Sequence, residues 1–371
     1  MKRLADICDI QYGYAFDSKC FTEDSSYPQL VRIRDVKRGY SETYYSGDYP
    51  EEYILSEGDL LIGMDGEFNI ARWKCSGALL NQRVCKLTTK VGTNEEYLRF
   101  AMLKSLKEIE QRTAFVTVKH LSVKELNKLE LDVPELTKQD KIADTLSRLE
   151  RVIEARKEEL EKLDNLIKAR FVEMFGDPRS NPFGFSKSVL KDTCKVVTGN
   201  TPSRAVQEYY GNYVEWIKTD NIVSEMINPT KATESLSEEG MKVGRTVDKD
   251  SILMACIAGS IASIGKVCVT DRTVAFNQQI NAIVPEEYNI LFLYVLLQLS
   301  KDYLIEDINM ALKGILSKSK LEEKEFIVPP MELQKQFADF VDQVDKSKVA
   351  VQKALEKTQL LFDSLMQQYF G

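Results

Sequence analysis

Residues 134–176 read PELTKQDKIADTLSRLERVIEARKEELEKLDNLIKARFVEMFG, and residues 329–371 read PPMELQKQFADFVDQVDKSKVAVQKALEKTQLLFDSLMQQYFG. The two stretches have equal length and match without a gap at an offset of 195 residues, with Pro134 aligned to Pro329 and Gln139 to Gln334. Self-similarity at a fixed offset is the mark of a structural unit that is built more than once. The repeat therefore predicts a chain of two halves that end in the same kind of segment.

Both repeated segments are predicted to be long helices. Their apolar residues alternate in steps of four and three, which is the pattern of a coiled-coil seam. A helix of about 35 residues is roughly 50 Å long, which is more than a domain of this size covers. We therefore expect the two helices to pair with each other, although each could instead pack on its own domain. The predicted seam residues are Leu146, Leu149, Ile153, Leu160 and Leu163 in the first helix and Val344, Val351, Leu355 and Phe362 in the second.

The remaining parts of the two halves match more loosely. Leu121-Ser122 aligns with Leu316-Ser317 at the same offset, Asn81-Gln82 with Asn277-Gln278 at an offset of 196, and the offset near the start is 186. Short β-rich runs separated by Gly, Asp and Asn predict strands and turns, and one helix is expected over 95–111 and another over 290–303. The interpretation is an α+β domain built twice, with domains at 1–133 and 177–328 and helical segments at 134–176 and 329–371.

The composition argues against catalysis. The 371 residues include a single histidine and seven cysteines without a C-x-x-C pair, so we expect no metal site and no disulfide framework. Gly259 to Lys266 differs from a phosphate-binding loop in spacing and is followed by Val267 instead of a hydroxyl residue. No secretory signal or membrane span is evident. The sequence predicts a cytoplasmic, non-catalytic protein without a cofactor.

Basic residues at matching places in the two halves are the candidates for binding nucleic acid. Residues 30–40 read LVRIRDVKRGY, and a strand there would place Arg32 and Arg34 on one face, with Lys37 and Arg38 in the next turn. Arginine can grip a guanine edge, and lysine holds phosphates. The further candidates are Arg72, Lys74 and Lys119 in the first half and Lys218, Asn221, Lys266 and Lys313 in the second. Ordinary solvated surface is the alternative, and the net charge of −7 does not by itself favour nucleic acid.

The doubled arrangement resembles the DNA specificity subunit of type I restriction-modification systems. The matching features are Val133-Pro134, Gln139 and Ala143 in one half and Val328-Pro329, Gln334 and Ala338 in the other. The resemblance implies two pseudo-twofold-related α+β target-recognition domains joined by two long helices that form an antiparallel coiled coil. It also implies that each domain reads one half of a bipartite, asymmetric site in double-stranded DNA.

The family's partners follow from the same resemblance. The helices set the half-site spacing and dock modification methyltransferase subunits, expected to number two, and a restriction-translocase subunit can join. Two alternatives stay open: a coiled-coil scaffold for other proteins, with recognition domains that no longer bind DNA, and an enzyme with an unfamiliar site. DNA retardation by the partner complex distinguishes the scaffold, and turnover by this chain alone distinguishes the enzyme.

Overall fold

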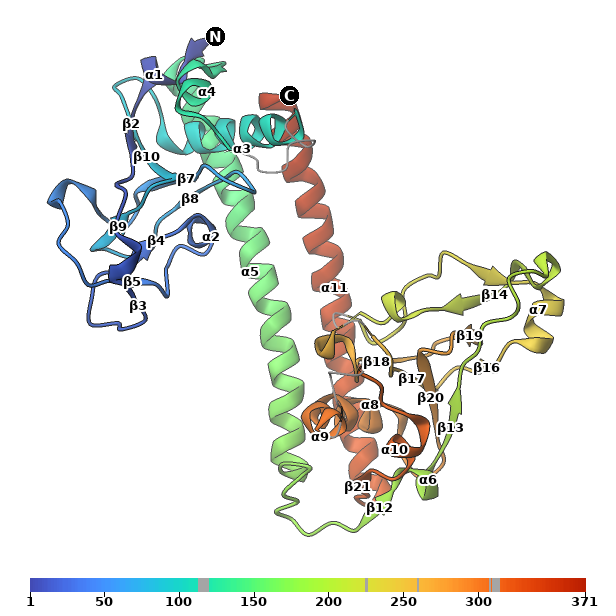
Figure 1. Ribbon diagram of the computed structural model, residues 1–371. Helices are drawn as coiled ribbons and strands as arrows, with labels where there is room; N and C mark the ends of the chain where they lie inside the picture. Colours follow the sequence, from blue (N-terminus) through green and yellow to red (C-terminus); the bar gives the residue numbers. More distant parts are fainter. Residues whose placement is uncertain (113–119, 224–225, 259, 307, 309–313) are drawn as a thin grey trace. The chain divides into compact units, whose positions relative to one another are not determined.

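The repeat in the sequence is also a repeat in the fold. The computed structural model (Figure 1) describes residues 1–112, 120–223, 226–258, 260–306, 308 and 314–371. It divides into two units: unit 1 contains Met1–Arg156 and Ala354–Gly371, and unit 2 contains Lys157–Lys353. Each unit therefore consists of one α+β domain with segments of both long helices.

The domain of unit 1 is organised around a four-stranded antiparallel sheet. Its strand order is β2 (Cys8–Tyr12), β10 (Val84–Thr89), β7 (Leu60–Gly63) and β8 (Asn69–Arg72). The smaller sheets are β1 (Lys2–Arg3) with β11 (Glu130–Leu131), β3 (Phe21–Thr22) with β5 (Tyr44–Tyr45), and β4 (Leu30–Val31) with β9 (Ala78–Leu80) and β6 (Ile54–Leu55). The helices are α1 (Leu4–Ile7), α2 (Ile33–Val36), α3 (Glu95–Arg112) and α4 (Val123–Lys128). Apolar residues of β7, β10 and α3 are buried together in one core.

The domain of unit 2 repeats the main sheet and the two-stranded sheet of unit 1, while its remaining strands form one sheet of four. Its main sheet runs β13 (Cys194–Thr198), β20 (Ile280–Pro285), β17 (Ile252–Ala255) and β18 (Val267–Val269). β12 (Lys187–Val189) pairs with β21 (Glu325–Ile327), and the other sheet is β15 (Ser235–Leu236), β14 (Tyr210–Ile217), β19 (Val274–Phe276) and β16 (Thr246–Val247). The helices are α6 (Leu190–Thr193), α7 (Glu238–Val243), α8 (Ile290–Leu299), α9 (Lys301–Ile305) and α10 (Lys318–Glu322). The predicted α+β class is confirmed.

Equivalent close contacts support the alignment of the two halves. Gly13 lies so close to the turn after β9 that an added Cβ would meet the carbonyl oxygen of Asn81 at 2.0 Å. Gly199 has the same relation to Asn277, at 2.2 Å. Because only glycine lacks a Cβ, the approach of these backbones requires glycine at both positions. The Asn-Gln turn is therefore held in the same way in each half.

The long helices are α5 (Leu136–Phe175) and α11 (Met331–Phe370), each of 40 residues. In unit 2 they pair in antiparallel fashion, because Asp164 pairs with Lys348 while Phe171, further along α5, packs against the earlier Phe337 at 5.4 Å between ring centres. In unit 1 the guanidinium of Arg156 donates to the carbonyl oxygen of Ala354 and to the hydroxyl of Thr358. The predicted pairing of the helices is confirmed, and so is its antiparallel direction.

The predicted seam matches the burial along both helices. Leu146 and Ile153 are buried, as is Val344, and the other predicted positions are half-buried, namely Leu149, Leu160, Leu163, Val351, Leu355 and Phe362. The seam prediction omitted two fully buried aromatic residues, Phe171 and Phe175, which pack with Phe292 of α8. They belong to the core between the helix and the domain of unit 2, so a heptad count along one helix could not reveal them.

A buried glutamine fastens each long helix to its domain. The amide oxygen of Gln139 accepts a hydrogen bond from the Asn94 N–H at 2.9 Å, and its amide nitrogen donates to the Pro134 carbonyl at 2.7 Å. Gln334 makes the same pair of bonds, from the N–H that begins α8 and to the carbonyl of Pro329. The repeated Pro-x4-Gln pattern therefore ties the start of the long helix to the start of the closing helix.

Two local predictions were wrong. The strand expected through Arg32 and Arg34 ends at Val31, and α2 begins at Ile33, so the two arginines do not share a strand face. The buried Asp35 explains this change, because its carboxylate accepts the Arg32 N–H at 3.0 Å and so stabilises the first turn of a helix. The helix expected over 290–303 is divided at Ser300, where α8 ends and α9 begins.

Candidate nucleic-acid interface

The basic segment of unit 1 is an exposed turn around α2. Asp35 is buried and also accepts the hydroxyl of Ser41 at 2.9 Å. Arg34, Lys37 and Arg38 project outward, with side chains that are 63%, 70% and 51% exposed. Lys37 pairs with Glu67 at 3.2 Å and Arg38 with Glu42 at 3.8 Å, and such exposed ion pairs are worth about 0–1 kcal/mol each. Arg34 contacts the buried Asp35 only at 3.8 Å. These cations are therefore available to a ligand.

Arg32 and Arg34 line a cavity of about 400 Å³. Its other walls include Phe16, Phe21 and the turn of residues 81–83, in which Arg83 has a φ of 70°. Arg83 pairs with Asp65 at 3.0 Å but keeps 62% of its side chain exposed. Guanidinium groups, amides and aromatic rings are the groups that contact phosphates and base edges. The cavity thus brings together the chemistry of nucleic-acid recognition.

The equivalent segment of unit 2 is more strongly neutralised. Lys218 takes the position of Arg32, and its N–H donates to the side-chain oxygen of Asn221 at 3.0 Å, as the Arg32 N–H does to Asp35. Asn221 is buried, with only 7% of its surface exposed, so it holds the turn and is not presented to a ligand. The ammonium of Lys218 pairs with Glu234, which also pairs with Arg204 at 2.6 Å.

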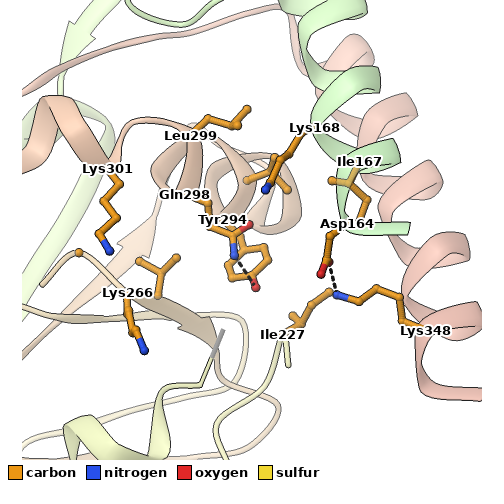
Figure 2. Close-up of a pocket in the computed structure, with 13 residues that line it drawn as sticks. Asp164, Ile167, Lys168, Ile227, Lys266, Tyr294, Gln298, Leu299, Lys301 and Lys348 are labelled. Atoms are coloured by element: carbon orange, nitrogen blue, oxygen red, sulfur yellow. Dashed lines mark hydrogen bonds and ion pairs between the residues drawn. The ribbon is translucent and has the colours of Figure 1, made fainter. Parts of the chain in front are cut away.

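Lys266 lies elsewhere in unit 2, at a cavity between β18, α8 and the long helices (Figure 2). Lys74 is exposed, and its side-chain carbons lie against Gly39, which has a φ of +81°. Lys119 and Lys313 lie outside the described residues. The expected turn beside Lys119 is present nevertheless, because Ser122 and Glu125 form the predicted capping box at the start of α4. DNA contact at these lysines stays a prediction.

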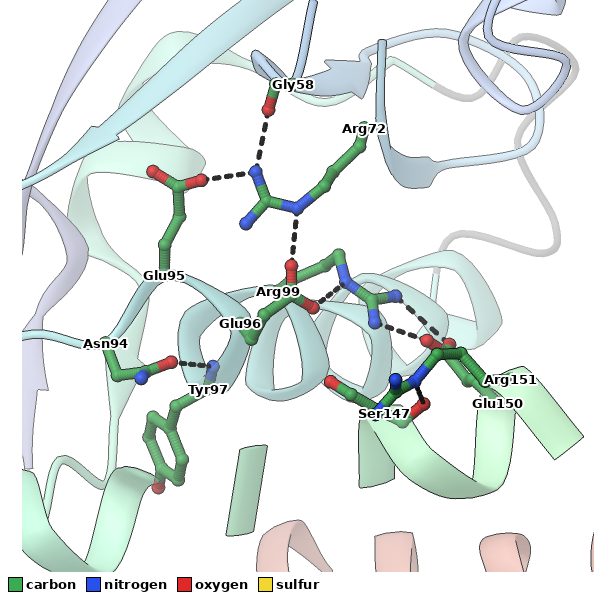
Figure 3. Close-up of polar contacts among 10 residues, drawn as sticks. All are labelled: Gly58, Arg72, Asn94, Glu95, Glu96, Tyr97, Arg99, Ser147, Glu150 and Arg151. Carbon is green, nitrogen blue, oxygen red and sulfur yellow. Dashed lines mark hydrogen bonds and ion pairs between the residues drawn. The ribbon is translucent and has the colours of Figure 1, made fainter. Parts of the chain in front are cut away.

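Arg72 is held in an ion-pair network at the junction of β8, α3 and α5 (Figure 3). Its guanidinium contacts Glu95 at 2.6 Å and Glu96, and donates to the Gly58 carbonyl at 2.7 Å. Arg99 joins Glu96 at 2.7 Å to Glu150 on α5. Burial acts to lower the pKa of Arg72, but Glu96 and Glu95 outweigh it and the pKa is raised. Arg72 therefore links sheet and helix, and its guanidinium is bound within the fold by Glu95, Glu96 and the Gly58 carbonyl.

Arg83 and Arg204 lie beside the candidate segments but were not among the contacts predicted from the sequence. Arg83 directly follows the repeated Asn81-Gln82 pair, so its place beside a recurring turn was visible in the sequence. Arg204 lies over two aromatic rings, with its guanidinium carbon 4.5 Å from the ring centre of Tyr210 and 5.0 Å from that of Trp216. No sequence pattern indicated Arg204, because its partners come from β14 and lie 6 and 12 residues away.

Five of the seven cysteines are core residues. Cys8, Cys85, Cys194, Cys256 and Cys268 are buried, and burial raises the pKa of each thiol to about 12. Thiols of such high pKa are poor nucleophiles at neutral pH. Among the described residues no three His, Cys, Asp or Glu side chains are grouped as metal ligands. The described helices include none whose length and apolarity would let it cross a membrane.

Comparisons with known proteins agree with the doubled architecture. The specificity subunit of the type I restriction enzyme EcoBI from Escherichia coli is 39% identical over 166 residues, which are 44% of this chain and 35% of that subunit. The HindI specificity subunit from Haemophilus influenzae is 32% identical over 120 residues, 32% of this chain and 25% of that subunit. The matched stretches thus span about a third or less of the length of these relatives.

Solved structures share the fold over the whole chain. The S subunit of a type I restriction-modification system from M. genitalium has a TM-score of 0.64 at 15% identity, covering 100% of this chain and 95% of its own. A chain solved in work on complex assembly and conformational transition of the type I system has a TM-score of 0.54 at 18% identity, covering 100% and 96%. The family of the type I restriction modification DNA specificity domain matches residues 1–165 and 182–360. Because this match includes most of both halves, the chain belongs to the family of type I restriction-modification DNA specificity proteins.

Proposed function

We propose that this chain is a sequence-reading subunit that brings DNA methylation and restriction to a two-part target in double-stranded DNA. Each α+β domain reads one half-site. One observation supports this proposal above all. The two halves share the strand order of the main sheet and the hydrogen bonds of the buried glutamine, while their exposed polar groups differ. Two readers of the same fold with different surfaces would recognise two unlike half-sites, so the target is asymmetric.

In the first domain we assign the reading surface to the cavity between α2 and the turn of residues 81–83. Arg32 and Arg34 line it, and Arg83 completes a set of three guanidinium groups. Among the described residues Arg32 has no acidic partner for its side chain, and Arg34 has only a 3.8 Å contact with the buried Asp35. A bidentate arginine contact to guanine is worth about 1–3 kcal/mol of discrimination. Lys37 and Arg38 beside them would hold phosphates.

In the second domain the reading surface is the segment that starts at Lys218. Lys218 and Arg204 share one carboxylate, Glu234, whose pKa is lowered chiefly by its hydrogen bond to Lys218. A phosphate that approached this pair would compete with an existing ion pair. The second domain therefore relies less on free cations than the first, and its half-site differs accordingly.

The paired helices supply the docking surface for partners. Leu136 and Met331, equivalent in the repeat, are 46% and 40% exposed, and Leu166 and Leu361 are 47% and 50% exposed. Large apolar side chains exposed at equivalent repeat positions fit binding sites that occur twice. We therefore propose that two modification methyltransferase subunits dock on the helices, which also set the half-site spacing, and that a restriction-translocase subunit can join. The chemistry belongs to these partners.

A domain exchange tests the proposal. Replacing residues 1–133 with the corresponding domain of another specificity subunit should change one half of the methylated sequence and leave the other half and the spacer unchanged. Mapping methylated adenines in a host that carries the chimaera gives the result directly. A change in both halves would refute separate reading. If the assembled complex failed to retard duplex DNA with a steep salt dependence, the chain would be a scaffold.

A further inference from the structure

A cavity in unit 2 is surrounded by lysines. It has a volume of about 290 Å³ and lies between α5, β18, α8 and α11 (Figure 2). Lys168, Lys266, Lys301 and Lys348 line it, and Asp164 is its one acidic lining residue. In Figure 2, Lys168, Lys266 and Lys301 lie on three sides of Tyr294 and Gln298. The cavity therefore concentrates positive charge within a protein whose net charge is negative.

The cavity's own acidic groups do not neutralise this charge. Asp164 pairs with Lys348, whose side chain is 11% exposed. Asp345 lies one turn before Lys348, and burial raises the pKa of its carboxyl, which disfavours its charged form. Lys301 donates to the carbonyl oxygen of Ala262 at 2.5 Å, which satisfies a donor but not the charge. Within the described parts of the chain, Lys168 and Lys266 have no acidic partner.

The equivalent place in unit 1 also has a cavity, of about 390 Å³, but two of the cations that line it are bound by carboxylates. There β8, α3 and α5 meet, and the cations Arg72 and Arg99 are bound by Glu95, Glu96 and Glu150. At the offset of 195, Tyr294 takes the place of Arg99 in unit 2. At the same offset Ile290 and Leu291 stand where unit 1 has Glu95 and Glu96. Two carboxylates that bind cations in the first half are therefore missing from the second half.

Like charges that line one cavity with a single acidic residue repel one another, and the repulsion is relieved when an anion enters. Lysine is a common phosphate ligand because its ammonium is a compact point charge. The volume lies near the lower end of the range for small-molecule sites, which suits a phosphate or short polyphosphate group. Ile167, Ile227 and Leu299 supply apolar walls for the part of a ligand that carries it.

We propose that this cavity binds the phosphate groups of a small phosphorylated molecule, of the inorganic polyphosphate or nucleotide class. The cavity is lined by other residues than the two surfaces assigned to DNA reading, although Lys266 is also a candidate DNA contact, so the experiment below measures both ligands. The proposal does not depend on the proposed function. The ammonium groups of Lys168 and Lys266 would hold the phosphate oxygens, Lys301 would add a third contact, and the pair of Lys348 with Asp164 would form the floor.

Isothermal titration of the full chain with inorganic tripolyphosphate tests the proposal. We expect saturable binding of one equivalent, weakened at least tenfold in the double variant Lys168→Gln/Lys266→Gln. The matched control is Lys191→Gln/Lys195→Gln, which removes two exposed lysines of the same unit away from the cavity. Absence of saturable binding, or equal affinities of the two double variants, would overturn the proposal. If the cavity variant fails to fold, the single change Lys168→Gln on the exposed face of α5 gives the same comparison.

A second arm distinguishes the source of the phosphate. Non-specific duplex DNA is titrated into the same two double variants. Loss of tripolyphosphate binding with unchanged DNA binding supports a small ligand. Loss of DNA binding while tripolyphosphate binding stays unchanged would assign the lysines to the DNA backbone and overturn the small-ligand proposal. Sequence specificity is read separately, from the methylation pattern, so failure of one proposal leaves the other measurable.

Discussion

Replacing Gln334 by methionine removes two buried hydrogen bonds while it keeps the side-chain volume nearly constant. The glutamine is 1% exposed, accepts the Asn289 N–H at 2.9 Å and donates to the Pro329 carbonyl at 2.8 Å. Asn289 is the residue that caps α8. Because a thioether chain can neither donate nor accept usefully, Gln334→Met leaves both backbone groups without these partners. The change therefore isolates the polar contribution of the Pro-x4-Gln pattern.

The size of the effect follows from the burial of the two partners. A buried backbone group that loses its partner costs about 1–3 kcal/mol. Pro329 is buried and receives the full penalty, whereas Asn289 is half-buried and water can replace part of its lost bond. We therefore expect Gln334→Met to lower the free energy of unfolding by about 2–4 kcal/mol. An exposed glutamine two residues further along the same helix, Gln336, provides the matched control.

Two measurements on the full chain check this expectation. Urea denaturation followed by circular dichroism gives the shift of the midpoint, and amide hydrogen exchange at Asn289 reports the bond itself. Gln334→Met should lower the midpoint and speed that exchange, whereas Gln336→Met should do neither. The reasoning fails if the two variants are equally stable. Gln139→Met should reproduce the effect at Asn94 in unit 1, because Gln139 makes the same two bonds and a further one to the Gly92 carbonyl.

Three further predictions concern unit 1. Arg34→Ala should weaken binding to the specific duplex by about 1–3 kcal/mol if the side chain meets a base edge; fluorescence anisotropy at several salt concentrations measures it, and unchanged affinity would remove Arg34 from the interface. Gly13→Ala should destabilise the chain by about 1–3 kcal/mol through overpacking, because its Cβ would lie 2.0 Å from the Asn81 oxygen; a wild-type melting temperature would contradict this. Glu96 has a pKa lowered below its ordinary value of 4.5, because Arg99 and Arg72 outweigh the opposing effect of burial. Its charged form therefore stabilises the fold above that pH, and the contribution is lost as the pH falls. Glu96→Gln should reduce the loss of unfolding free energy at acid pH, measured by urea denaturation at several pH values. Identical pH dependence in the variant and the wild type would contradict this.

The parts of the fold that the sequence predicted are those that depend on spacing. The offsets of 195, 196 and 186 residues correctly aligned the two halves, and the steps of four and three located the helix seam. The strand prediction through Arg32 and Arg34 failed because alternation of apolar and basic residues is also compatible with a capped turn. Asp35, three residues after Arg32, was the available indication, and Asn221 follows Lys218 at the same distance.

The candidate site was harder to predict than the fold because charge depends on partners far away in the sequence. Arg72 and Lys218 were both basic residues in turn-rich segments, and nothing local distinguished them from Arg34. Their acidic partners, Glu96 and Glu234, lie 24 and 16 residues away. Only the folded chain shows that Arg72 and Lys218 are bound to carboxylates while Arg34 projects into solvent.

The two halves differ in their exposed and cavity-lining groups and agree in their internal contacts. Contacts that hold the scaffold recur in both: the buried glutamines, the glycines beside the Asn-Gln turns, and isolated bridges that join Asp65 to His120 and Ile257 to Ile315. The groups that face solvent or line cavities do not recur, since three guanidiniums meet at one turn in unit 1 and four lysines line a cavity in unit 2. A substitution at a cavity wall leaves the hydrogen bonds of the buried glutamines intact. Each half of a duplicated fold can therefore change its surface residues independently of the other half. The proposed reading of two different half-sites by one architecture rests on that separation.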